Sequence, residues 1–442
     1  MLKKIITTST LLLAANSPAM ADLKTDWESI LSNYNMTPQY HSFCYTDKNG
    51  EIKGSNPNMK VRLASVSKLI TSYWALEKLG ADYQYKSEFY LVDKHLHIVG
   101  DLDPIYSKRK LFFLLSQLNN LGIHELDKIT FDKNLIVYAN AEDYTGDILR
   151  MTTSRSATNL KDFFHTPDWN RLKVAYKDFI KSTPTEVIDN LQIREDLEDL
   201  NLSVKSVSVV EENPLKDSPD AMRTIHLSPI IVKYLKAMNI KSNNFIADQV
   251  FNKLGGEKEF DKFIKTKIEN WLPNLDVDRT NFSKTESSIK LYSGSGLPEF
   301  KNSERLDNFA TCSIIVKIVE EMDKKLDEVG KSLAKITAVS GSDIDKTGAT
   351  QSTIRARFLS PKVKDSLMVK TGTLFHTSTL AGKVSANNGA HYFGVFHQLR
   401  GWKGNAKASQ DEIVEKLVET NGGAQKVHYE KEFFFPAYEV MR

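Results

Sequence analysis

The chain has 442 residues, which at roughly 100–200 residues per domain excludes a single small module. Hydrophobic residues make up 41% and charged residues 26% of the chain, as in ordinary globular proteins, so the composition excludes an intrinsically disordered protein. The formal net charge is only +3, and positive and negative residues are interspersed along the chain. This argues against a nucleic acid or another strongly acidic molecule as the binding partner.

The first 21 residues are typical of a secretory signal peptide. Lys3 and Lys4 precede an apolar run from Ile5 to Ala15, and small residues lead to an expected cleavage site after Ala21. The apolar run has about half of the ~20 residues that a membrane span needs, so we expect no integral membrane span. The sequence therefore predicts a protein secreted into the periplasm.

Three elements are predicted next. Apolar residues recur at helical spacing over 23–34, and residues 40–53 are predicted to form two strands around an Asn49-Gly50 turn. A strongly apolar helix follows over 66–79 and ends at Gly80.

Residues 88–235 differ in character, with short alternating apolar runs, a loop over 100–104 and an acidic stretch over 195–200. We interpret them as an inserted α+β region. His95 and His97 have the spacing of one strand face, and we expect ordinary strand residues rather than metal ligands.

Helices return over 230–238 and 245–254. Two β-rich runs, 366–384 and 390–399, are separated by Asn387-Asn388-Gly389, whose turn chemistry predicts an antiparallel hairpin. A last helix is expected over 410–420.

These patterns predict an α/β (α+β) protein with an antiparallel sheet flanked by helices. The expected division is a signal peptide (1–21), a main domain (22–87 with 236–442) and an inserted accessory domain or domains (88–235).

The chain has two cysteines, Cys44 and Cys312, which excludes a disulfide framework and a cysteine-based zinc site. The pair could form a bridge in an oxidising compartment, but the sequence cannot place them close enough, and we favour two buried free thiols. We expect no metal and no cofactor.

Ser65 and Lys68 open the apolar helix, one turn apart, so the hydroxyl and the amine share a face. The helix start offers backbone N–H groups to a developing oxyanion. To act as a general base near pH 7, a lysine needs its pKa lowered by about three units, which burial and a second cation would supply. This predicts an activated serine nucleophile.

The same pattern recurs at Ser107/Lys110, Ser287/Lys290 and Ser332/Lys335, in surroundings that we expect to be polar and solvated. The candidate second cation is Lys370 in Lys370-Thr371-Gly372-Thr373, where a strand begins. Glycine there would let a substrate backbone approach the strand. A second Lys-Thr-Gly, at 346–348, lies in a polar segment, and we favour Lys370.

Between these elements lies Ser242-Asn243-Asn244 at a helix start, which could equally be an ordinary N-cap. A competing Ser-x-Asn at 385–387 is expected to be turn chemistry at a hairpin end.

The order Ser-x-x-Lys, Ser-x-Asn, Lys-Thr-Gly is that of penicillin-binding proteins and β-lactamases. The surroundings resemble one branch, the class C low-molecular-mass penicillin-binding proteins, which are D-alanyl-D-alanine carboxypeptidases and endopeptidases. The resemblance rests on these motifs and on segments 62–69, 100–104, 238–244 with Ala247, 294–297 and 370–374. It implies the penicillin-binding, serine β-lactamase-like transpeptidase fold with a large α+β insertion.

The resemblance also implies roles for individual residues. Ser65 attacks the carbonyl of the penultimate D-Ala of a peptidoglycan stem peptide with Lys68 as the base, while Ser242 and Asn244 serve proton transfer and hold the substrate amide. Lys370 and Thr371 bind the terminal carboxylate, and Gly372 leaves room beside them. The N–H groups of Thr373 and Ser65 form the oxyanion hole. β-Lactam antibiotics are the implied inhibitors.

Two departures from the family pattern concern substrate detail: Ser293 stands where Asp is usual, and the loop over 341–353 is expanded. Two alternatives remain open. A secreted serine β-lactamase would place Ser-x-Asn nearer to Ser65, and a catalytically silent wall-binding scaffold would not need intact motifs.

Overall fold

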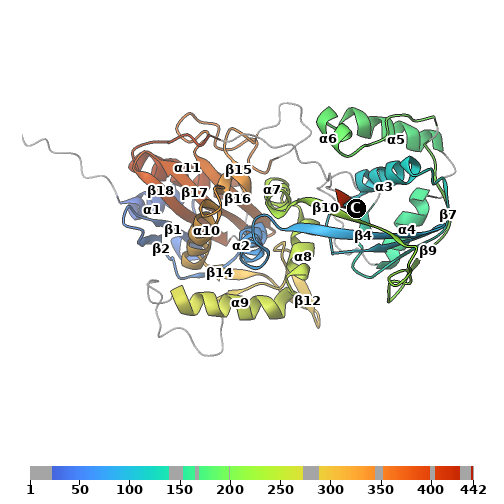
Figure 1. Ribbon diagram of the computed structural model, residues 1–442. Helices are drawn as coiled ribbons and strands as arrows, with labels where there is room; N and C mark the ends of the chain where they lie inside the picture. The colour runs from blue at the N-terminus through green and yellow to red at the C-terminus, as the bar shows by residue number, and fades with distance from the viewer. Residues whose placement is uncertain are drawn as a thin grey trace, which may run out of the picture.

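The computed structural model describes residues 22–138, 153–164, 169–198, 200–271, 288–343, 352–398, 404–428 and 440–441. Figure 1 shows two lobes joined by the long strands β4 (Gln84–Val92) and β10 (Met222–Ile230). The predicted signal peptide, residues 1–21, lies outside the described residues.

Within the described residues, a six-stranded antiparallel sheet forms the larger lobe. Its strands, in spatial order, are β15 (Ala338–Val339), β16 (Leu367–Leu374), β17 (Thr377–Ala386), β18 (Gly389–Gln398), β1 (His41–Thr46) and β2 (Ile52–Ser55). Successive residues of β1 point to opposite faces, so Phe43 and Cys44 belong to different apolar clusters. The sheet is therefore buried on both sides.

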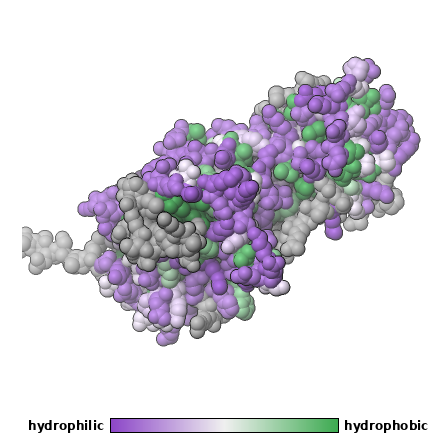
Figure 2. All heavy atoms as spheres, turned by 90° about the horizontal axis from the view of Figure 1, so that it is seen from below, coloured by the Kyte–Doolittle hydropathy of each residue, from purple (hydrophilic) through white to green (hydrophobic). Residues whose placement is uncertain are grey.

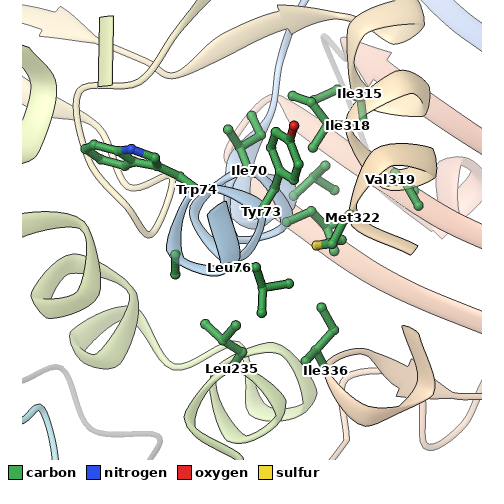
Figure 3. Packing of buried hydrophobic residues seen from close by; sticks show 14 of the residues in the cluster. Ile70, Tyr73, Trp74, Leu76, Leu235, Ile315, Ile318, Val319, Met322 and Ile336 are labelled. Atoms are coloured by element: carbon green, nitrogen blue, oxygen red, sulfur yellow. The ribbon is translucent and has the colours of Figure 1, made fainter. Parts of the chain in front are cut away.

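One face carries α1 (Leu23–Asn33) and α11 (Gly404–Thr420), and the other carries α2 (Ser67–Leu79) and α10 (Cys312–Asp327). Helix α2 is enclosed by α10 and by α7 (Ile231–Lys241), α8 (Asn244–Lys253) and α9 (Gly256–Trp271). Figure 3 shows Tyr73 of α2 near Ile315 and Ile318 of α10. Each fully buried side chain of this size contributes roughly 1.5–3 kcal/mol, so this packing fixes the position of α2.

Short strands complete the larger lobe: β3 (Lys60–Arg62), β11 (Ile289–Lys290) and β14 (Phe309–Thr311) form one small sheet, and β12 (Glu299–Lys301) pairs with β13 (Glu304–Leu306).

The smaller lobe is built on a second sheet, in the order β19 (Val440–Met441), β10, β4, β5 (His95–Val99), β7 (Glu125–Phe131) and β9 (Ser203–Val209). Around it lie α3 (Lys108–Asn120), α4 (Thr153–Phe164), α5 (Trp169–Lys181), α6 (Thr185–Asn190) and the pair β6 (Tyr106–Ser107) and β8 (Val137–Tyr138). A separate apolar cluster fills this lobe. The exact limits of the insertion, 88–235, stay a prediction.

Most predicted elements of the larger lobe are confirmed, with two differences. The run 366–384 is two strands, β16 and β17, which turn at Phe375-His376 and pair Leu374 with Thr377. No glycine, proline or asparagine marks this turn, so the pattern hid it. The last helix begins at Gly404 rather than at residue 410.

The expectation of free thiols is wrong. Cys44 on β1 and Cys312 at the start of α10 form a disulfide, with their Cα atoms 6.1 Å apart. Helix α10 crosses the sheet directly beside β1, an arrangement that sequence spacing does not encode.

No described helix has both the length and the apolar character that spanning a membrane requires. In Figure 2, hydrophilic residues cover most of the visible face and hydrophobic ones form small separate patches.

Candidate active site

Ser65 lies in a 3-10 turn, Ala64–Val66, that leads directly into α2. The Leu63 amide donates to the Asn308 carbonyl at 3.0 Å, and Thr379 Oγ1 on β17 donates to the Leu63 carbonyl at 2.9 Å. Ala64 has a φ of 47°, a strained value for a residue with a side chain. The turn is thus held between two sheets, and Ser65 stays half-buried.

Lys68 is completely buried, and its amine is surrounded by three acceptors. Nζ lies 3.1 Å from Ser65 Oγ, 2.8 Å from Asn244 Oδ1 and 2.8 Å from the Ser295 carbonyl oxygen. The Ser-x-x-Lys pair and the Asn of the Ser-x-Asn element therefore meet at one nitrogen.

Burial lowers the pKa of Lys68 to about 7, while the negative charge of Asp248 acts in the opposite direction. The expected depression of the lysine pKa is thus present, with burial as its main cause. The expected second cation, Lys370, lies close enough for the positive charge of Lys68 to lower the pKa of Lys370. Asp248 is a carboxylate that the sequence reasoning missed. At neutral pH a large fraction of Lys68 is uncharged and can accept a proton.

Ser242 ends α7 in the left-handed conformation, with a φ of 57°. This sharp turn lets α8 start at Asn244, and the N-cap is Asn243, whose side chain accepts the Ile246 amide at 2.9 Å. An N-cap role for Ser242 is therefore wrong, and its hydroxyl is left for a different partner.

That partner is Lys370, whose Nζ donates to Ser242 Oγ at 3.1 Å and to the Thr371 carbonyl at 2.6 Å. Lys370 is completely buried, and burial together with the positive charge of Lys68 holds its pKa well below the usual range. The two polar side chains of the Ser-x-Asn element thus bind one amine each, Asn244 that of Lys68 and Ser242 that of Lys370.

Gly372 on β16 packs directly against the turn of Ser65. A Cβ there would lie 2.2 Å from Thr379 Oγ1, 2.8 Å from the Leu63 carbonyl oxygen and 2.9 Å from the Ser65 amide nitrogen. Only glycine lets the strand approach this closely. Thr371 is half-buried and Thr373 is exposed on the same strand.

The competing motifs lie elsewhere or outside the described residues. Asn387 donates to the Gly422 carbonyl at the β17–β18 turn, as expected for turn chemistry. Lys346 and Ser287 are not among the described residues. The expectation of a solvated Lys110 is wrong, since it is buried and forms an ion pair with Asp103.

The loop over 294–297, which is part of the family resemblance, carries Ser295, a residue to which the sequence analysis gave no role. The Ser295 amide donates to Asp248 Oδ1 at 2.8 Å, and Asn308 Nδ2 donates to the Ser293 carbonyl at 2.7 Å. Ser293, the departure from the family pattern, closes the loop by donating to the Leu297 carbonyl at 2.7 Å. Asp248 follows Asn244 by four residues, so helical spacing could have indicated it.

The residues that the structure describes include no group of three His, Cys, Asp or Glu side chains placed to hold a metal ion. The chemistry that this arrangement offers is a hydroxyl beside a partly deprotonated amine, with a second buried amine nearby.

The sequence model of the D-Ala-D-Ala carboxypeptidase 3 (S13) family matches residues 44–150 and 191–420. No curated protein matches the chain.

Several solved structures are similar. Bd3459, a predatory peptidoglycan endopeptidase from Bdellovibrio bacteriovorus, is 26% identical, with 89% of this chain and 96% of that chain covered and a TM-score of 0.71. Bd0816, a predatory endopeptidase of the same organism in complex with immunity protein Bd3460, is 26% identical, with 90% of this chain and 99% of that chain covered and a TM-score of 0.73. Penicillin binding protein 4 from Haemophilus influenzae shares the fold, with a TM-score of 0.56. It is 15% identical, with 89% of this chain and 99% of that chain covered.

Proposed function

Since the chain belongs to the D-Ala-D-Ala carboxypeptidase 3 (S13) family, we propose that it is a penicillin-binding serine DD-peptidase of peptidoglycan whose nucleophile is Ser65. The observation that carries this proposal is the 3.1 Å approach of the buried Lys68 amine to Ser65 Oγ.

Acylation starts with the uncharged form of Lys68. Its two N–H groups donate to Asn244 Oδ1 and the Ser295 carbonyl, so the lone pair is directed at Ser65 Oγ. The Ser65 proton passes to Lys68 as Oγ attacks the substrate carbonyl. When the C–N bond breaks, the leaving amine takes up a proton relayed from Lys68 through Ser242, and water later hydrolyses the ester to free Ser65.

Lys370 and Thr371 are the proposed binding site for the terminal carboxylate of the substrate. The Lys370 amine already lies beside Ser242 and the Thr371 carbonyl, next to the reacting groups. A carboxylate favours the charged form of a buried lysine, so substrate binding is expected to protonate Lys370.

The leaving group decides between two activities. A D-Ala leaving group makes the enzyme a carboxypeptidase, and the side-chain amine of a cross-linked stem makes it an endopeptidase. We propose both activities, with the endopeptidase supported by the similarity to Bd3459. Digestion of purified wall fragments and identification of the released products tests which bond is cut.

We also propose that the enzyme works in the periplasm after removal of residues 1–21, with 88–235 as an inserted accessory domain. The Cys44–Cys312 disulfide supports an oxidising compartment. Peptidoglycan is the substrate available there.

A fluorescent penicillin separates this proposal from its alternatives. Penicillin G acylates the relative Bd3459. We expect a stable adduct on the wild type and none on Ser65→Ala. Rapid turnover of the label would indicate a β-lactamase, and an unlabelled wild type would indicate a silent scaffold.

A further inference from the structure

Asp248 is the acidic residue of α8, and it has no role in the reaction described above. It is half-buried and lies one helical turn after Asn244, on the side of α8 that faces the loop carrying Ser295. Its Oδ1 accepts the Ser295 amide at 2.8 Å. A carboxylate in such a place loses hydration, and burial raises its pKa despite this hydrogen bond.

Ser295 joins Asp248 to the lysine. Its amide donates to the carboxylate, while its carbonyl accepts Lys68 Nζ at 2.8 Å. The same loop packs directly against the turn that carries Ser65, because a Cβ at the neighbouring Gly296 would clash with the Ala64 carbonyl oxygen. Asp248 therefore holds one of the three acceptors that define the direction of the Lys68 amine.

Three neighbouring charged groups influence the charge of Lys68. Lys370 on β16 and Asp248 on α8 face Lys68, and Glu299 on β12 acts on Asp248. Of these, Asp248 is the group whose charge favours the ammonium form of Lys68, against the burial that favours the free amine.

We propose that Asp248 is a positioning residue of the peptidase: through Ser295 it directs the Lys68 amine at Ser65, and its charge sets how tightly that amine holds its proton. The proposal rests on the proposed function, because it assigns Asp248 a purpose only if Lys68 is the base.

The test is Asp248→Asn, which removes the charge and keeps an oxygen to accept the Ser295 amide. The readout is the rate constant of acylation by a fluorescent penicillin from pH 5 to pH 9. Loss of the negative charge makes the ammonium less favourable, so the acidic limb of the profile is expected to move to lower pH by about one unit or more.

Two further variants complete the experiment. Asp248→Glu keeps the charge and is expected to leave the limb near its wild-type position even if its plateau rate falls. Asp261→Asn removes a carboxylate on α9 that pairs with Lys290, and it is expected to leave the profile unchanged.

Two results would overturn the inference: an acidic limb that stays in place in folded Asp248→Asn, or a limb that moves equally far in Asp261→Asn. In either case the proposed function still stands if the fluorescent penicillin labels Ser65. Should Asp248→Asn fail to fold, a limb in Asp248→Glu that moves to lower pH overturns the inference equally. A wild type that takes no label overturns both.

Discussion

Replacing Gly372 by alanine tests how closely β16 must approach the turn that carries Ser65. The new Cβ would lie 2.8 Å from the Leu63 carbonyl oxygen and 2.9 Å from the Ser65 amide nitrogen, whereas ordinary contact begins at 3.4 Å. The backbone around Ser65 must therefore retreat from β16 by about half an ångström. Since a misplacement of about 1 Å at a reacting group costs about 100-fold in rate, we expect acylation to slow roughly 10- to 100-fold.

The assay is the second-order rate constant for acylation by a fluorescent penicillin, measured beside the thermal unfolding of the same variant. Overpacking is expected to cost about 1–3 kcal/mol of stability, which leaves the protein folded at room temperature. Adding Thr379→Ala to Gly372→Ala removes the clash of the new Cβ with Thr379 Oγ1 but leaves its two contacts with the backbone at Leu63 and Ser65. Acylation of the double variant should therefore stay slow. Wild-type acylation by Gly372→Ala would refute this reasoning.

Three further predictions concern the buried amines and histidines. Lys68→Ala should lose at least roughly 100-fold in acylation rate and keep its unfolding transition; near-normal labelling would exclude Lys68 as the base. Lys370→Ala should impair acylation severely and Lys346→Ala hardly at all, and the reverse ranking in the same assay would identify the other Lys-Thr-Gly as functional. Burial lowers the pKa of His41 to about 4 and that of His226 to about 3. Below about pH 6.5 the unfolded chain therefore binds more protons at these two histidines than the folded chain does. The free energy of unfolding in urea should therefore fall as the pH drops from about 6.5 towards 4, by up to about 3 kcal/mol for His41, and His41→Gln should flatten this dependence.

The contact between Ser65 and Lys68 was predictable because it depends on local spacing. Ser65 and Lys68 are one helical turn apart, and the apolar helix that follows them distinguishes this pair from its copies. The same reasoning misjudged Lys110, because its burial depends on Asp103 and on the packing of the smaller lobe against the larger one. Charge pairs between elements leave no periodic trace in a sequence.

The rest of the site depends on contacts between distant segments. Asp248 carries the right spacing from Asn244, yet nothing local shows that the Ser295 amide would reach it from across the site. The Cys44–Cys312 bridge has the same origin, since it needs α10 to cross β1. The β16–β17 turn was missed for a different reason, because the turn residues Phe375 and His376 include no glycine, proline or asparagine that would mark it.

The bridge has a consequence for an enzyme exposed to proteases. It closes a covalent ring that runs from Cys44 to Cys312 and contains Ser65 and Ser242, whereas Lys370 lies on the tail that leaves the ring. A single cut anywhere within the ring, including the smaller lobe, leaves both fragments attached to each other. In such a nicked molecule the fragment with Ser65 stays linked to the fragment with Lys370, and the two would separate only after reduction of the disulfide.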